Sequence, residues 1–145
     1  MRPDAAPPRS LTVSAVVLTG DDGRVITVRK RGTDRFMLPG GKPEPGETAL
    51  DCAVREVHEE LGLRLDPAAL VEVGEFMTSA ANEPGFALNS TVFEASAPGT
   101  PRPRAEIDEV RWVDPAAFAE MDEADCAPWA PLLTRVMGMR SRGEM

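Results

Sequence analysis

Three closely spaced glutamates, Glu56, Glu59 and Glu60, carry the most specific chemistry in this 145-residue sequence. At the 100° rotation per residue of an α-helix, they fall within roughly 100° of one another. Like charges three and four residues apart repel, so helix stability does not require them. Hard divalent cations bind such oxygens, and Mg²⁺ in particular takes one or two carboxylates together with phosphate oxygens and water. On their own, however, three such carboxylates are more often a solvated acidic face.

The segment before the glutamates favours the chemical interpretation. The sequence Leu38-Pro-Gly-Gly-Lys-Pro43 is a loop rich in glycine and proline, whose bare backbone can approach a ligand or a metal closely. Thr48 and Asp51 match a capping box, and Gly62 suits the left-handed position after a helix end. We therefore predict a helix over residues 49–61, with a cation- and phosphate-binding loop in front of it.

Residues 41–63, GKPEPGETALDCAVREVHEELGL, resemble the signature of the Nudix hydrolases. That signature is G-x5-E-x7-R-E-U-x-E-E-x-G-U, where U is aliphatic, and the chain matches every specified position; we call this segment the box. The resemblance implies an α/β fold, a Nudix-type α/β/α sandwich with a mixed β-sheet and the box as loop–helix–loop. It also implies an enzyme that hydrolyses diphosphate bonds with Mg²⁺, for which Mn²⁺ can substitute.

The resemblance also assigns roles inside the box. It implies that the metal is bound by the main-chain carbonyl of Gly40 and by the carboxylates of Glu56, Glu59 and Glu60. Glu56 would also be the general base, Arg55 would orient the carboxylates, and Glu47 would brace Arg55 or the loop. The alternative for Glu47 and Arg55 is a surface ion pair, which contributes under about 1 kcal/mol.

Basic residues outside the helix are candidates for binding the substrate phosphates. Arg29 and Lys30 end a predicted strand, after which the chain must return at once to the glycine-rich loop. We favour Arg29 over Lys30, and we include Lys42 of the loop. Charged residues of this kind attract phosphates, although a basic cluster at a strand end is often only solvated.

Many Nudix enzymes place a further glutamate from a downstream loop near the metals. Here the Pro-rich loop 97–104 leads into Glu106, Asp108 and Glu109. We predict that this loop is mobile, in the manner of a lid, and that Glu106 rather than Glu109 is the additional catalytic acid, because the sheet does not fix its position. The alternative is a charged strand edge that discourages aggregation.

Hydrophobic periodicity predicts the remaining elements. We expect strands over 11–19, 24–30, 70–79, 86–96 and 107–114, and a last amphipathic helix over 128–139. Residues 11–139 would form a single domain, between a flexible arm over 1–10 and a frayed tail over 140–145. The helices would cover both faces of a mixed sheet.

Composition excludes several function classes. A net charge of −8 argues against a surface for polymeric nucleic acid, and no aliphatic run is long enough to span a membrane. The first ten residues lack the apolar core of a signal peptide, so we expect a cytoplasmic protein, monomeric or homodimeric, that binds a small nucleotide. Cys52 and Cys126 are too few for a disulfide framework.

Within the family, the choice of substrate class rests only on elimination. Members that cleave ADP-ribose usually carry a proline downstream of the box, where this chain has Thr78 and Ser79, and members that cleave diadenosine polyphosphates usually carry a tyrosine, which this chain lacks. The prediction is hydrolysis of a (deoxy)nucleoside triphosphate to the monophosphate and pyrophosphate. The alternatives are hydrolysis of another nucleoside diphosphate derivative, such as a nucleotide sugar, and nucleotide sensing without catalysis. An isomerase branch that acts on isopentenyl diphosphate needs a reactive cysteine in the pocket, and Cys52 is predicted to lie off the buried stripe of the helix.

Overall fold

A computed structural model describes residues 10–34, 36–79 and 87–114 of the chain. Its elements in order are β1 (Ser10–Thr19), β2 (Val25–Lys30), β3 (Gly40–Gly41), α1 (Ala49–Leu61), a 3-10 helix (η1, Pro67–Ala69), β4 (Val71–Ser79), β5 (Ala87–Ser96) and β6 (Ile107–Val113). Except for Ser10, which begins β1, the predicted arm lies outside these residues, and so do the predicted tail, the predicted last helix and Cys126.

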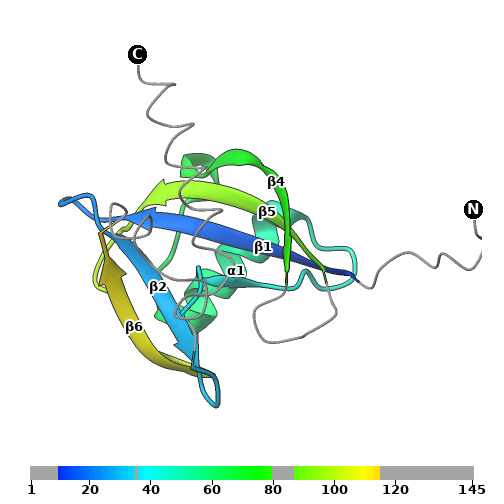
Figure 1. The fold of residues 1–145 in the computed structure, drawn as a ribbon. Coiled ribbons are helices and arrows are strands. Elements are labelled where there is room, and N and C mark those ends of the chain that lie inside the picture. Colours follow the sequence, from blue (N-terminus) through cyan, green and yellow to red (C-terminus); the bar gives the residue numbers. More distant parts are fainter. Residues whose placement is uncertain (1–9, 35, 80–86, 115–145) are drawn as a thin grey trace, which may run out of the picture.

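The strands form one mixed sheet, as predicted. Its order is β4-β5-β1-β2-β6 (Figure 1). The short β3 pairs with β1. β1 and β5 run parallel in register from Ser10↔Ala87 to Thr19↔Ser96, whereas β1–β2, β2–β6 and β4–β5 are antiparallel. The predicted pairing of the strands on either side of residues 80–86 is therefore confirmed.

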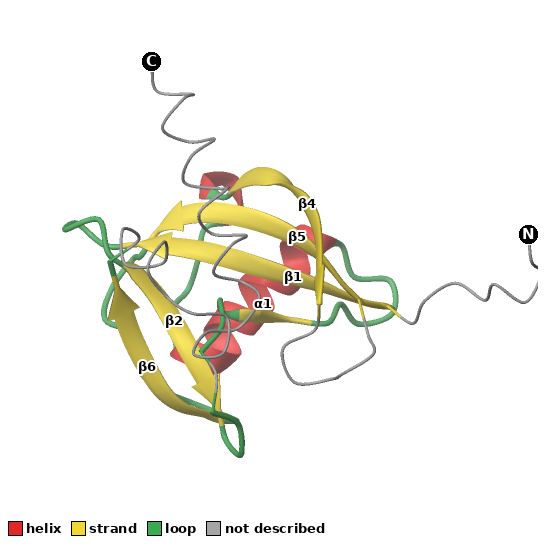
Figure 2. Cartoon of the chain, viewed as in Figure 1, coloured by secondary structure: helices red, strands yellow, loops and turns green. Residues whose placement is uncertain are grey.

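Both faces of β1 are buried, because alternate residues enter two separate cores. Val16 and Leu18 pack in the cluster that contains Val57 and Leu61 of α1, whereas Ala15 and Val17 pack in a cluster on the other face. Figure 2 shows α1 lying against the sheet. Each fully buried aliphatic side chain of this kind contributes roughly 1.5–3 kcal/mol, so this packing holds α1 in a fixed position on the sheet.

The helix has the bounds that its capping residues predict. The Thr48 side chain accepts a hydrogen bond from the main-chain N–H of Asp51 (3.1 Å), a cap that contributes about 1 kcal/mol. At the other end Gly62 adopts φ 73°, and its N–H donates to the carbonyl of His58. The acidic face of α1 is thereby placed beside β3.

Candidate active site

β3 holds the glycine-rich loop against both β1 and α1. Gly40 pairs with Ala15 and Gly41 with Ser14. A Cβ atom on Gly40, whose φ is 153°, would clash with the carbonyl oxygen of Ser14, and one on Gly41 would clash with the carboxyl group of Glu56. The loop can lie this close to β1 at Gly40 and to α1 at Gly41 because both positions are glycine.

Glu60 is a carboxylate buried beneath this loop. Its residue is only 3% exposed, and Oε1 accepts a hydrogen bond from the N–H of Gly40 (3.1 Å). Burial, together with the nearby charge of Glu56, raises the pKa of Glu60 to about 8, although the hydrogen bond from Gly40 opposes this rise. A buried acid with one main-chain donor and a like-charged neighbour is costly to ionise, and a bound cation would offset that cost.

Arg55 gathers the other acidic side chains of the box. Its Nη1 lies 3.1 Å from Glu56 Oε2 and 3.2 Å from Glu59 Oε1. Its Nε and Nη2 contact the two oxygens of Glu47, and Nη2 also donates to the carbonyl of Lys42 (3.2 Å). Arg55 therefore joins α1 to the loop that precedes it.

Two carboxyl groups of this network, Glu47 and Glu56, have pKa values shifted in opposite directions. Hydrogen bonds from the Arg55 guanidinium lower the pKa of Glu47 to about 2. Burial raises the pKa of Glu56, and Arg55 partly offsets that effect. Glu47 and Arg55 thus form a permanently ionised pair beside Glu56 and Glu60, whose carboxyl groups are harder to ionise.

The donor set suits a hard divalent cation. Within the described parts of the chain, no three or more His, Cys, Asp or Glu side chains are already arranged to hold a metal ion, since Arg55 draws Glu56 and Glu59 toward itself. Nevertheless, Glu56 and Glu60 are buried or half-buried carboxylates that repel each other. Mg²⁺ takes one or two such carboxylates and fills its other positions with water and phosphate oxygens. The residues fit this metal.

Of the two predicted strand-end cations, Lys30 acts on the carboxylates. Burial raises the pKa of both Glu56 and Glu60, and the positive charge of Lys30 partly offsets that rise. Its Nζ lies 3.2 Å from Glu106 Oε1. Arg29, which the sequence ranked first, donates to the carbonyl of Thr33 (2.9 Å) and pairs with Asp108 and Glu109.

The strand register explains why Arg29 and Lys30 have different surroundings. Pairing between β2 and β6 shifts between Arg29 and Lys30, which breaks the regular alternation of the strand. No local sequence signal marks this irregularity of the strand register.

Lys42 is exposed, and its ammonium group makes no ion pair among the residues that the structure describes.

The Pro-rich loop 97–104, which the sequence predicted to be a mobile lid, is attached to α1 at its C-terminal end. The N–H groups of Arg102 and Arg104 donate to the carbonyls of Leu61 (3.0 Å) and Glu60 (2.9 Å). The last carbonyls of a helix have no partner within it, so they are available to such donors. The loop therefore caps the helix.

Cys52 is fully buried, so the prediction that it lies off the buried stripe was wrong. Its thiol donates to the carbonyl of Gly41 (3.4 Å), and burial raises the pKa of the thiol. The close approach of β3 to α1, which helical periodicity does not reveal, covers this side chain. A thiol with a raised pKa forms little thiolate and is a poor nucleophile.

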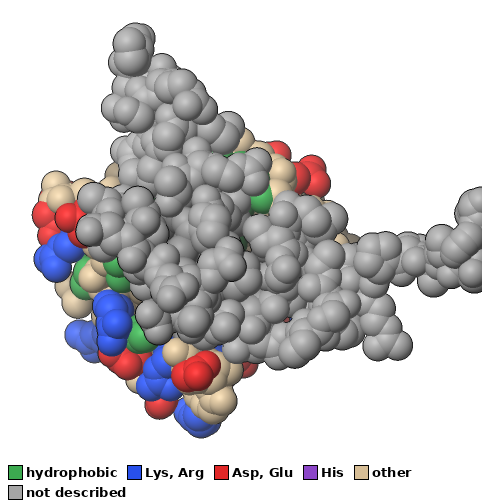
Figure 3. Space-filling view, in the orientation of Figure 1, with side chains coloured by type: hydrophobic (Ala, Val, Ile, Leu, Met, Phe, Trp, Pro, Cys, Tyr) green, Lys and Arg blue, Asp and Glu red, His purple; other side chains and the backbone are tan. Residues whose placement is uncertain are grey.

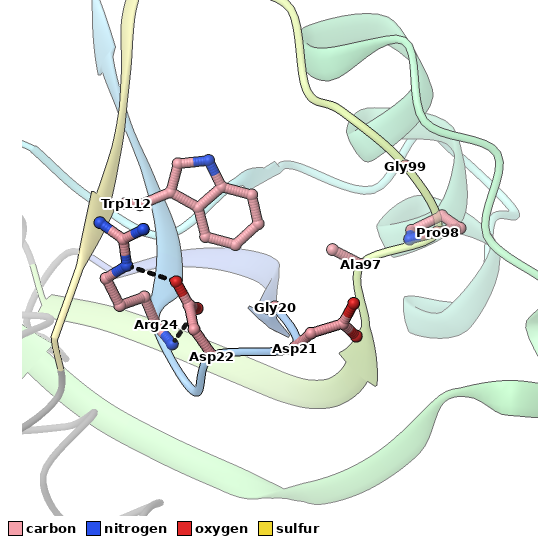
Figure 4. Close-up of a pocket in the computed structure, with 8 residues that line it drawn as sticks. All are labelled: Gly20, Asp21, Asp22, Arg24, Ala97, Pro98, Gly99 and Trp112. Atoms are coloured by element: carbon pink, nitrogen blue, oxygen red, sulfur yellow. Dashed lines mark hydrogen bonds and ion pairs between the residues drawn. The ribbon is translucent and has the colours of Figure 1, made fainter.

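A separate pocket of about 590 Å³ lies at the β1–β2 turn, near Trp112 (Figure 4). It is lined by Gly20, Asp21, Asp22, Arg24, Ala97, Pro98, Gly99 and Trp112. None of these is a predicted site residue, and the pocket adjoins the start of β2, whereas Lys30 ends that strand. On the visible described surface, acidic and basic side chains are interspersed and form no basic stripe (Figure 3).

Comparisons with known proteins agree with the geometry. The NUDIX domain model matches residues 8–133. An isopentenyl-diphosphate Delta-isomerase of Cutibacterium acnes is 34% identical over 143 residues, which cover 85% of this chain and 70% of that protein. An RNA pyrophosphohydrolase of Halorhodospira halophila is 39% identical over 59 residues, 41% of this chain but only 32% of its own length.

A solved structure shares the fold. The MutT protein of Methanosarcina mazei superposes with a TM-score of 0.74 at 17% identity, covering 94% of this chain and 99% of that one. Among the described residues, no helix has the length and apolar character needed to cross a membrane.

Proposed function

The chain belongs to the NUDIX domain family, and on that premise we propose that it is a metal-dependent pyrophosphohydrolase. The observation that carries the proposal is the acidic face of α1 beneath the glycine-rich loop. There Glu60 is buried, Glu56 touches the loop, and Arg55 holds Glu56 and Glu59. Such an arrangement of oxygens beside closely approaching backbone suits a cation and a phosphate chain.

Each residue of the site has a distinct part in the proposed reaction. Glu56, Glu59, Glu60 and the carbonyl of Gly40 would hold Mg²⁺ or Mn²⁺, which when bound neutralises charge on the phosphoryl oxygens. Glu56 would accept the proton of the attacking water, for which its half-buried carboxyl with a raised pKa is suited. Arg55 and Glu47 would keep the carboxylates in place.

Cations outside the box would bind the phosphates. The charge of Lys30 already acts on Glu56 and Glu60, so an incoming phosphate chain would meet this ammonium group beside the carboxylates. Arg29 and Lys42 remain candidates for the more distant phosphates. Glu106, paired with Lys30, is the candidate for an additional catalytic acid.

We assign the substrate to nucleoside diphosphate derivatives, first among them the (deoxy)nucleoside triphosphates. The reaction would yield the (deoxy)nucleoside monophosphate and pyrophosphate. Its support is the absence of the sequence marks that other subgroups usually carry. A relative of part of the chain is named an RNA pyrophosphohydrolase, which supports the broader class of diphosphate hydrolysis. Nucleotide sugars are the next class, and a nucleotide-sensing domain without catalysis is the third.

Isomerisation of isopentenyl diphosphate is a second candidate function, because a relative with that name is 34% identical over most of the chain. Two observations oppose it. The box retains every carboxylate of the hydrolase signature, and the thiol of Cys52 is buried with a raised pKa. The other cysteine, Cys126, lies outside the described residues.

One panel of substrates separates these functions. The protein should be incubated with Mg²⁺ and nucleoside triphosphates, ADP-ribose, nucleotide sugars or isopentenyl diphosphate. The products should be identified by ³¹P NMR and mass spectrometry, and by ¹H NMR for isopentenyl diphosphate, because isomerisation leaves its mass unchanged. We expect a nucleoside monophosphate and pyrophosphate, and we expect Glu56→Gln to form neither. Conversion of isopentenyl diphosphate alone would establish the isomerase, and nucleotide binding without turnover would establish the sensor.

A further inference from the structure

The turn formed by residues 104–106 joins the C-terminal end of α1 to the end of β2. On one side the N–H of Arg104 donates to the carbonyl of Glu60 (2.9 Å). On the other side the carbonyl of Glu106 accepts from the N–H of Arg31 (2.7 Å), and Glu106 Oε1 lies 3.2 Å from Lys30 Nζ. The turn 104–106 thus connects the main chain of Glu60, the buried carboxylate, to Glu106.

Ala105, in the middle of this turn, has a left-handed backbone. Its φ of 54° is the only positive value at a non-glycine position in the described ranges. Residues other than Gly, Asn and Asp rarely adopt this conformation, which persists where surrounding contacts enforce it. Here the N–H of Ile107 closes the turn on the carbonyl of Arg104 (2.9 Å), and Arg31 Nη2 donates to the carbonyl of Ala105 (3.4 Å).

The side chain of Ala105 is exposed, so packing does not explain the conformation. The left-handed residue sets the relative orientation of the two peptide groups that flank it. With another φ at Ala105, the Arg104 N–H would not face α1 while Glu106 faces β2. The backbone of this one residue therefore sets the direction in which the Glu106 side chain leaves the main chain, on the side where it meets Lys30.

We propose that the turn 104–106 is a positioning element of the hydrolytic site, in which left-handed Ala105 holds the Glu106 carboxylate against Lys30. The inference rests on the proposed function, because it assigns Ala105 a role in turnover that is exerted through Glu106. Ala105 touches no reacting group and is a positioning residue.

A matched pair of substitutions tests the backbone requirement. Ala105→Asn introduces a residue that tolerates the left-handed region, and Ala105→Val introduces a β-branched residue that does not. Because the position is exposed, both side chains have room. We expect Ala105→Asn to keep kcat within about threefold and Ala105→Val to lose about tenfold or more, with KM little changed, as the cost of forcing this backbone predicts.

A double-mutant cycle separates positioning from a general structural defect. If Ala105 acts through Glu106, Ala105→Val should cause no further loss of kcat in the Glu106→Gln background. The same substitution should cost its full factor in the Glu109→Gln background, since Glu109 pairs instead with Arg29 and Arg111. Equal losses in both backgrounds would show that Ala105 does not act through Glu106.

A chemical cross-link reports the position of Glu106 without any turnover. A carbodiimide activates the Glu106 carboxyl, the Lys30 amine attacks to form an amide bond, and the carbodiimide leaves as its urea. At 3.2 Å the two groups should join in the wild type and in Ala105→Asn, and much less in Ala105→Val, as measured by peptide mass spectrometry.

The two readouts distinguish the failure of this inference from that of the proposed function. A wild type that cleaves no nucleotide would refute the proposed function and the catalytic part of the inference. An active wild type whose Ala105→Val variant keeps both turnover and the cross-link would refute the inference alone.

Discussion

Arg55 and Glu47 form a bidentate pair across the start of α1, with Nε 2.8 Å from Oε2 and Nη2 2.9 Å from Oε1. The two side chains are 23% and 13% exposed, so this is not a solvated surface pair. The planar guanidinium matches the two carboxylate oxygens, which fixes its orientation as well as its position. Its remaining nitrogen, Nη1, is thereby directed to Glu56 and Glu59.

Replacing Arg55 with lysine should therefore lower kcat by roughly 10–100-fold, the usual effect of residues that orient metal ligands. A lysine ammonium retains the charge but cannot contact Glu47, Glu56 and Glu59 in one plane. The control is Arg24→Lys, which alters an exposed pair with Asp22 of similar length (2.7 Å). Steady-state kinetics of both variants decide the matter, and an equal small effect of the two would contradict the assigned role of Arg55.

Glu60→Gln should remove metal-dependent activity while the protein stays folded. Glutamine can still accept the hydrogen bond from Gly40, but it supplies no charge to a cation. We expect a loss of kcat above about 100-fold, larger than that of residues which only orient ligands. Mn²⁺ affinity measured by calorimetry should fall in parallel, whereas Glu72→Gln, on an exposed residue of β4, should change neither. Turnover near that of the wild type would show that Glu60 is not a metal ligand.

The metal-free protein should lose stability as the pH rises, because of Glu60. Its pKa in the folded state is about 8, above the value of 4.5 for an ordinary glutamate. The fold therefore favours the protonated form, and this contribution is complete below about pH 4.5 and disappears as the pH rises through about 8.

Thermal unfolding in EDTA measures this effect against Glu60→Gln, which cannot ionise at that position. The melting temperatures of the two proteins should be similar at pH 5, and the wild type should become the less stable one by pH 9. Mg²⁺ should close that gap by compensating the carboxylate. A constant difference across the pH range would mean that Glu60 ionises normally.

Local signals predicted the box helix well, and contacts between distant segments explain what they missed. Thr48 and Gly62 mark the helix ends because capping depends on neighbouring residues only. The burial of Cys52 depends instead on β3, which pairs with β1 far away in sequence. Likewise, the irregular β2–β6 register that separates Lys30 from Arg29 arises from strand pairing.

The same distinction applies to the Pro-rich loop. Its composition predicted mobility, because proline and glycine do not form regular elements. The structure attaches the loop to the carbonyls of Glu60 and Leu61, which only the folded arrangement brings near Arg102 and Arg104. Chemistry-bearing residue types could thus be found from the sequence, but the contacts that position them could not.

Bond specificity should be stricter than base specificity. The phosphate chain would meet the charged residues of the box and Lys30, whereas the residues we consider for the base, Phe36, Met37 and Asn89, are few and mostly apolar. Phe36 is partly buried, with the guanidinium of Arg111 4.2 Å above its ring. A base site formed mainly by apolar side chains would discriminate between ligands that differ by one polar group by only about 100-fold.

Measurement of kcat/KM for the four common deoxynucleoside triphosphates, with the matching mono- and diphosphates, tests this expectation. We expect the triphosphates to differ by less than about 100-fold among themselves, because no charged side chain among these candidates would read the base edge. The monophosphates lack the diphosphate bond and should not react. Asn89→Ala tests the one polar candidate, and it should alter the relative rates of the triphosphates more than their mean. A single base preferred by several orders of magnitude would show that a polar group outside these three residues reads it.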